Sequence, residues 1–180
     1  MGRKSLSFGY FILYGIVEQE IQRVFGHHLR LRVSGICIEQ ESILLVKHRS
    51  IGKKGILWAP PGGGLHYGET VSEALHREFL EETGLSVEMG MPLLINEYIE
   101  SPLHALELFF SVQCKGGEVR KGNDPEMGSG QQIIQEVRFV SFEEIRNSDP
   151  DIFHSLFKKY NQKEAFSSFL GFQQNIVLRG

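Results

Sequence analysis

The stretch from Thr70 to Leu85, TVSEALHREFLEETGL, carries the signals of one well-bounded helix. Thr70 and Glu73 have the spacing of a capping box, in which each side chain accepts a hydrogen bond from a backbone amide of the first turn. Gly84 stands where a helix usually ends, because glycine adopts the left-handed conformation of that position at little steric cost. The pattern predicts a helix from about residue 71 to residue 83.

The acidic residues of this helix lie on its apolar side. At about 100° per residue, Glu78 and Glu82 fall on the apolar face, and Glu81 lies at its margin. Two carboxylates about 4 Å apart repel each other by roughly 1 kcal/mol in water, and by several times more near a protein surface. A divalent cation among the three acids would offset this cost, because hard cations prefer oxygen ligands. The alternative is an acidic helix end neutralised by arginine, but Arg77 is one cation for three glutamates.

A glycine-rich segment, LWAPPGGGLHYGE, precedes the helix at residues 57–69. Its three consecutive glycines permit close approach of the backbone to a ligand. The segment is not a P-loop, because no Gly-Lys-Ser/Thr follows, and Tyr67 stands where a dinucleotide-binding fingerprint has its third glycine. By itself it is equally consistent with a tight turn. Beside an acidic helix, it can offer carbonyl oxygens to a metal and N–H groups to a phosphate.

The two segments together resemble the sequence box of the Nudix (MutT-like) hydrolases, G-x5-E-x7-R-E-U-x-E-E-x-G-U. Gly63 is followed after five residues by Glu69, and after seven more by the run Arg77–Leu85. Phe79 is the one departure, because the family usually has an aliphatic residue at that position. The resemblance implies an α/β (α+β) Nudix fold, in which a mixed β-sheet is sandwiched between helices.

The resemblance also implies a metal site. Its helix supplies three glutamates that look like metal ligands: Glu78, Glu81 and Glu82. Gly62 looks like a backbone carbonyl ligand, and Glu69 and Arg77 look like the pair that orients the glutamates. The implied cofactor is Mg²⁺, with Mn²⁺ as a second suitable ion.

The implied reaction is hydrolysis of a phosphoanhydride bond in a nucleoside diphosphate linked to another moiety. A nucleotide sugar such as ADP-ribose and a nucleoside triphosphate are both suitable substrates, and one of the glutamates would act as the base. The alternative is a catalytically silent sensing or binding module of the same fold. A weaker alternative is the family's isomerase of an isopentenyl double bond, whose additional metal-binding pattern is not evident.

The rest of the chain divides into a central domain and two extensions. We expect an N-terminal helical extension at residues 1–29, the Nudix-like domain at 30–147, and a C-terminal helical extension at 148–180 that packs on the domain. Apolar segments at 31–39 and 42–49 predict a hairpin, because they are rich in Val, Ile and Leu and flank a polar pair.

Two further strand-like runs, at residues 92–100 and 104–114, surround a predicted hairpin tip at 101–103. Residues 133–140 form another strand candidate, and Ser141 begins a short helix with a capping-box pattern. A last helix is expected after Pro150, because four apolar residues follow at helical spacing: Phe153, Leu156, Phe157 and Tyr160.

Six residues are candidates for contacts with the substrate: Arg49, Trp58, Gly63, Gly64, His104 and Glu107. Trp58 could stack on a base or pack in the core, and Arg49 could meet a phosphate or mark an exposed strand end. With the tip at 101–103, Glu97 and Glu107 would face each other across the hairpin. Facing like charges are unfavourable, so a cation between them would explain the pair, whereas a different register would remove it.

The composition of the chain limits the classes of binding partner that we expect. The formal charge of −3 does not favour duplex nucleic acid, which needs a basic surface. The two cysteines imply no disulfide framework and are consistent with a cytoplasmic protein. The N-terminal apolar run is too short to span a bilayer, so no membrane partner is expected. We therefore expect a small nucleotide as the partner, and we leave a homodimer open.

Overall fold

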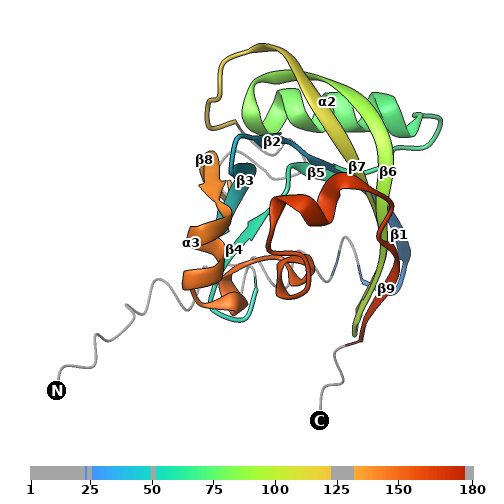
Figure 1. The fold of residues 1–180 in the computed structure, drawn as a ribbon. Helices are drawn as coiled ribbons and strands as arrows, with labels where there is room; N and C mark the ends of the chain where they lie inside the picture. Colours follow the sequence, from blue (N-terminus) through green and yellow to red (C-terminus); the bar gives the residue numbers. More distant parts are fainter. Residues whose placement is uncertain (1–22, 24–25, 50–51, 123–131, 177–180) are drawn as a thin grey trace, which may run out of the picture.

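The structure is a computed structural model, and it describes residues 23, 26–49, 52–122 and 132–176. Figure 1 shows the elements of this part of the chain. They follow in this order: β1 (Leu29–Ile36), β2 (Ile38–Glu39), β3 (Ser42–Arg49), β4 (Ile56–Ala59), β5 (Gly62–Gly64), α2 (Val71–Thr83), β6 (Leu85–Glu100), β7 (Leu103–Gly117), β8 (Ile134–Ser141), α3 (Phe142–Asn147), the 3₁₀ helices η1 (Pro150–Ile152), η2 (Ser155–Lys158) and η3 (Lys163–Ser167), and β9 (Gly171–Ile176).

The strands form two sheets. The first has the order β5-β1-β7-β6-β9 and is mixed, since β1 pairs with β7 in parallel and β6 pairs with β7 antiparallel. The second is built around β3, which pairs antiparallel with β2, β4 and β8. The mixed first sheet, the antiparallel second sheet and the helices together confirm the predicted α+β class.

The predicted hairpin of residues 31–39 and 42–49 is wrong for most of its length. Only β2 pairs with β3, through Ile38 opposite Ile43, whereas β1 belongs to the other sheet. The chain changes sheets at Cys37, whose carbonyl accepts a hydrogen bond from the amide of Leu44. The strands themselves were predicted correctly, but their partners come from distant segments that local pattern does not identify.

Two hydrophobic clusters hold the layers together. One lies under α2, where Leu75 and Phe79 pack against Val33 and Leu44. The other joins the sheets to the C-terminal segment, and its members include Trp58 and Phe109. Figure 1 shows α2 and α3 at opposite sides of the strands, so the strand layers lie between helices as expected.

The C-terminal segment differs from the expected helical extension. Its four spaced apolar residues are buried as predicted, but they belong to short 3₁₀ helices and their flanks rather than to an α-helix. The segment then ends in β9, which pairs in parallel with β6. The helical spacing of these residues therefore agrees with their burial, but it predicts neither the 3₁₀ helices nor the final strand.

The boundaries at residues 30 and 147 remain a prediction. Most of the expected N-terminal extension lies outside the described residues, and Leu29 already belongs to β1. Within the described residues, no helix is long and apolar enough to cross a bilayer.

Candidate active site

The helix α2 begins and ends as its sequence predicts. Thr70 is the N-cap, and its hydroxyl accepts a hydrogen bond from the amide of Glu73, whose carboxylate in turn accepts one from the amide of Thr70. Gly84 closes the helix with φ of 75°, in the left-handed region. These contacts involve only the helix's own residues, so the position of the helix along the sequence is fixed locally.

The glycines in front of the helix form a strand rather than an open loop. β5 pairs antiparallel with β1, with Val33 opposite Gly63 and Arg32 opposite Gly64. This pairing holds the glycine backbone against the acidic side of α2. A methyl group on Gly63 would lie 2.2 Å from a carboxylate oxygen of Glu78, so only glycine fits there without displacing Glu78.

Two of the helix glutamates are buried against this glycine strand. Glu78 is 7% exposed and Glu82 is 5% exposed. An oxygen of Glu82 accepts a hydrogen bond of 2.9 Å from the amide of Gly62. The carboxylates therefore face the backbone of the loop, in the direction that the helical periodicity predicts.

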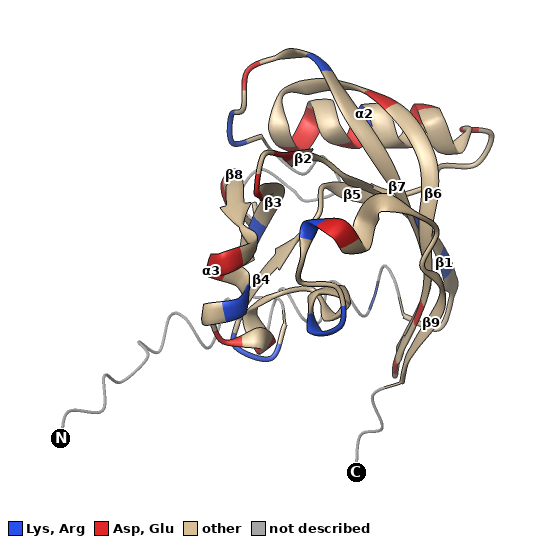
Figure 2. Cartoon of the chain, viewed as in Figure 1, with Lys and Arg blue, Asp and Glu red and all other residues tan. Residues whose placement is uncertain are grey.

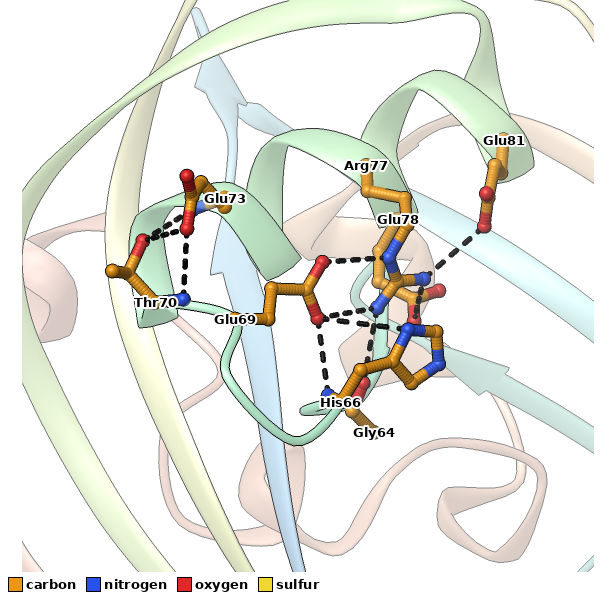
Figure 3. Close-up of polar contacts among 8 residues, drawn as sticks. All are labelled: Gly64, His66, Glu69, Thr70, Glu73, Arg77, Glu78 and Glu81. Atoms are coloured by element: carbon orange, nitrogen blue, oxygen red, sulfur yellow. Dashed lines mark hydrogen bonds and ion pairs between the residues drawn. The ribbon is translucent and has the colours of Figure 1, made fainter.

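Arg77 lies among the other acidic side chains (Figure 3). Its guanidinium makes two hydrogen bonds to Glu69, of 2.8 and 3.0 Å, one of 2.7 Å to Glu78, and one of 3.3 Å to Glu81. It also donates to the carbonyl oxygen of Gly64 at 3.1 Å. One arginine thus contacts three glutamates, of which Glu78 and Glu81 belong to its own helix.

The hydrogen bonds of Arg77 also affect the acidity of Glu69. Hydrogen bonds from its guanidinium lower the pKa of Glu69 from its ordinary 4.5 to about 2. The bidentate pair of Glu69 and Arg77 links the loop to the helix, which is the arrangement expected of residues that orient the other glutamates.

The donor set is suited to a divalent cation, although its side chains do not converge on one point. Among the described residues, no three His, Cys, Asp or Glu side chains are grouped as a metal ion would hold them. The carboxylates of Glu78, Glu81 and Glu82, together with the carbonyl of Gly62, are the hard oxygen donors that Mg²⁺ and Mn²⁺ prefer. Glu78 and Glu81 instead contact Arg77, so their side chains would have to reorient to hold an ion.

The substrate candidates lie in different surroundings. Gly63 and Gly64 belong to the glycine strand beside α2. Arg49, at the end of β3, donates a hydrogen bond of 2.9 Å to the carbonyl of Gln132. The ring of Trp58 is buried in the core, with Lys47 and Arg138 over it.

His104 and Glu107 lie on opposite faces of the hairpin of β6 and β7. Glu107 faces Asn96, and Glu97 faces Leu106, so the predicted pairing of Glu97 with Glu107 is wrong. The tip has two residues rather than three, because Glu100 pairs directly with Leu103. A shift of one residue reverses the face of every side chain. Glu97 and Glu107 therefore lie on different faces and cannot share a cation between them.

Glu97 and Glu107 have separate partners. His104 and Gln174 contact Glu97, at 3.2 and 2.7 Å. On the other face, an oxygen of Glu107 accepts hydrogen bonds from Asn96, at 2.6 Å, and from His154, at 3.1 Å.

Arg32, Asn96 and His154 were not identified from the sequence. Arg32 lies beside Glu107 on β1, with its Nε 3.6 Å from the carboxylate. A signal existed in the alternation of Arg30 and Arg32 with leucines along β1. The approach of His154 carried no signal, because it depends on the path of the C-terminal segment.

Burial by itself raises the pKa of Glu107, but the charge and hydrogen bond of His154, with smaller contributions from Arg32 and Asn96, outweigh it. The resulting pKa is about 2, well below the ordinary 4.5. Glu107 is therefore a carboxylate at neutral pH, and it carries a negative charge beside Arg32 of β1, the strand that separates β7 from the glycine strand.

Comparisons with known proteins identify the family of the chain. A family model of the NUDIX domain matches residues 28–159. An ADP-ribose pyrophosphatase from Methanocaldococcus jannaschii is 35% identical over 99 residues, which cover 54% of this chain and 58% of that protein. The match thus spans little more than half the length of that relative.

Solved structures share the fold. A NUDIX hydrolase from Nitrosomonas europaea has a TM-score of 0.61 at 24% identity, covering 73% of this chain and 85% of the other. An ADP-ribose pyrophosphatase from Streptococcus suis has a TM-score of 0.54 at 20% identity, covering 80% and 98%. A UDP-X diphosphatase has a TM-score of 0.55 at 18% identity, covering 89% and 74%. At these identities the likeness concerns the fold alone.

Proposed function

Because the chain belongs to the NUDIX domain family, we propose that it is a pyrophosphohydrolase that depends on a divalent metal. Its substrate would be a nucleoside diphosphate linked to another moiety, and the bond cleaved would be a phosphoanhydride. The observation that carries this proposal is the glycine strand held against two buried glutamates of α2, Glu78 and Glu82. Glu78 pairs with Arg77 and Glu82 with the amide of Gly62, and the oxygens of both carboxylates are the ligands that a hard divalent cation prefers.

The metal ligands in this proposal are Glu78, Glu81, Glu82 and the carbonyl of Gly62. When bound, Mg²⁺ or Mn²⁺ supplies positive charge against the diphosphate and makes a nearby water more acidic. The side chains of Glu69 and Arg77 orient the glutamates through their bidentate pair. One glutamate accepts the proton of the attacking water, and the rigid helix and strand hold the reacting groups in register.

ADP-ribose is the first substrate to test. The support is the relative from Methanocaldococcus jannaschii, whose name states that activity and which shares 35% identity over the matched segment. Other nucleotide sugars and nucleoside triphosphates belong to the same chemical class, since each contains a phosphoanhydride next to a nucleoside. We further propose that the protein acts on small nucleotides in the cytoplasm rather than on duplex nucleic acid.

A silent binding module is the second candidate. Its support is the hydrogen bonding of Arg77 to Glu69, Glu78 and Glu81, which gives three acids a partner without a metal. The two candidates differ in turnover. An enzyme of the proposed kind hydrolyses a substrate when Mn²⁺ or Mg²⁺ is present, whereas a silent module hydrolyses none, with or without a metal.

The test is an assay of phosphate-containing products with a panel of ADP-ribose, other nucleotide sugars and nucleoside triphosphates. The panel is run with Mg²⁺, with Mn²⁺ and with EDTA, and calorimetry measures Mn²⁺ binding separately. We expect metal-dependent release of a nucleoside monophosphate from at least one substrate. Metal binding without turnover on any substrate, or no metal binding at all, would replace this proposal with the silent module.

A homodimer is a separate proposal about assembly. Light scattering coupled to size exclusion measures the mass of the assembly in solution. A mass near 20.4 kDa would contradict the dimer and would leave the proposed chemistry unaffected.

A further inference from the structure

Arg32 lies between the glycine strand and the cluster around Glu107. On one side it pairs in the sheet with Gly64, and on the other with Glu107. Its side chain is 29% exposed, so the guanidinium is open to solvent. A single residue of β1 therefore borders both the candidate metal site and the polar cluster of the neighbouring strands.

The hydrogen-bonding capacity of Arg32 is mostly unused. A guanidinium has five N–H donors, yet one donor makes a long contact of 3.4 Å to the carbonyl of Gly62. Its Nε is 3.6 Å from Glu107, which is an ion pair beyond ordinary hydrogen-bond distance. The buried imidazole of His48 is close enough that the charge of Arg32 adds to burial in lowering the pKa of His48 to about 4. The planar fork of arginine suits bidentate contact with phosphate.

Glu107 does not depend on Arg32 for its hydrogen bonds. Its Oε2 accepts from both Asn96, which is fully buried, and His154. Its Oε1 is the atom that faces Arg32. One oxygen is thus anchored by the sheet and the C-terminal segment, while the other is left to orient the guanidinium. With this arrangement, the Glu107 carboxylate can hold the guanidinium of Arg32 in position while leaving most of its N–H donors available.

The side chain of Arg32 also reaches the backbone of the glycine strand. Its Nη2 points at the carbonyl of Gly62, whose amide holds Glu82. The guanidinium therefore lies next to the residues proposed to hold a metal and a diphosphate, but on the side of β1 rather than of α2.

We propose that Arg32 binds a phosphate oxygen of the substrate, and that Glu107 and His154 are positioning residues that act through it. This inference deepens the proposed function and rests on it, because it places the diphosphate beside Gly62. The chemical class that Arg32 selects is a nucleoside carrying at least two phosphates, rather than the nucleoside itself.

The test compares the binding of ADP and adenosine by calorimetry in the presence of Mg²⁺. Arg32→Gln is expected to weaken ADP binding at least tenfold and to change adenosine binding and Mn²⁺ binding less than twofold. Arg32→Lys should retain part of the ADP affinity, since it keeps the charge but not the fork. Glu107→Gln and His154→Gln should weaken ADP binding by smaller factors and leave adenosine binding unchanged.

Arg30→Gln is the matched control, because Arg30 lies on the same face of β1, two residues farther from the glycine strand. This variant should bind ADP within twofold of the wild type. A thermal unfolding transition, measured for each variant, shows that the comparison concerns folded protein. If Arg32→Gln does not fold, the conservative Arg32→Lys still tests the contact, through an expected loss of at least threefold for ADP alone.

Several outcomes would overturn the inference. They are an unchanged ADP affinity in the Arg32 variants, an equal loss for ADP and adenosine, and no binding of ADP by the wild type. The proposed function fails differently, through absence of hydrolysis across the substrate panel. An Arg32-dependent affinity for ADP without any hydrolysis would support the binding site and reject the enzyme.

Discussion

Two arginines border the glycine strand, and their surroundings are opposite in kind. Arg77 on α2 makes hydrogen bonds of 2.7 to 3.3 Å to three glutamates and one carbonyl. Arg32 on β1 makes one long hydrogen bond and one loose ion pair. The exposures of the two side chains are similar, at 22% and 29%. The two arginines therefore do not differ in burial, but they differ in how many of their N–H donors make hydrogen bonds.

The difference follows from the local distribution of charge. The sequence of α2 contains four glutamates and one arginine, so Arg77 is the counter-ion that its own helix requires. Figure 2 shows the acidic residues of this helix in red. Glu107 already has hydrogen-bond donors from Asn96 and His154, so Arg32 is not required in the same way. A cation whose acids are satisfied elsewhere is available to bind an anion.

The largest expected effect is a loss of activity when a glutamate of α2 is replaced by glutamine, compared with the same replacement on β7. Glu82→Gln should lower kcat at least about 100-fold, because a metal ligand and its charge are lost. Glu107→Gln should raise KM by a smaller factor and change kcat little. Steady-state kinetics with the best substrate of the panel measures both. A near-normal kcat for Glu82→Gln would remove this residue from the metal ligands.

The second effect concerns stability. Arg77→Lys should lower the free energy of unfolding by about 1–3 kcal/mol, because lysine cannot reproduce the bidentate pair with Glu69 and leaves partly buried acceptors without donors. Arg32→Lys should change it by less than about 0.5 kcal/mol. Urea unfolding at pH 7 measures both values. Equal losses in the two variants would contradict the distinction between the arginines.

The third effect tests the fit of the glycine strand. Gly63→Ala should weaken Mn²⁺ binding about tenfold, equivalent to about 1.4 kcal/mol, because the new methyl group would displace the Glu78 carboxylate. Gly116→Ala is the control, since its added carbon would meet nothing within 4 Å. Calorimetry with Mn²⁺ gives the two affinities. Wild-type affinity in Gly63→Ala would show that the position of Glu78 does not matter for the ion.

The smallest effect is the dependence of stability on pH. The folded-state pKa values of Glu69 and Glu107 are about 2, below the ordinary 4.5. These groups therefore contribute stability above about pH 4.5, which is lost progressively as the pH falls toward 2. His154→Gln should flatten this fall, because it removes a charge that lowers the pKa of Glu107. Urea unfolding between pH 3 and pH 7 checks the slope, and an identical slope in the variant would contradict the role of His154.

The elements that the sequence predicted well are those with local signals. The bounds of α2 follow from Thr70, Glu73 and Gly84, which contact only their own helix. The inward direction of Glu78 and Glu82 follows from helical periodicity alone. The hydrogen-bond partners of Arg77 described above lie at most 13 residues from it, so a short segment contains nearly all the information about this half of the site.

The elements that the sequence did not predict depend on distant segments. The register of β6 and β7 depends on whether the tip holds two or three residues, and that single residue decides which face Glu107 occupies. His154 reaches Glu107 across a separation of 47 residues. The C-terminal segment has helical spacing, yet the sheet offers it hydrogen bonds that an isolated helix does not.

The parallel pairing of β9 with β6 has a consequence beyond the active site. β9 covers the backbone of β6 from Leu94 to Ile99. A chain that ended before Gly171 would leave those amide and carbonyl groups as an open sheet edge, which can pair with another molecule. Loss of the last ten residues is therefore expected to promote aggregation, even though every residue of the glycine strand and of α2 would still be present.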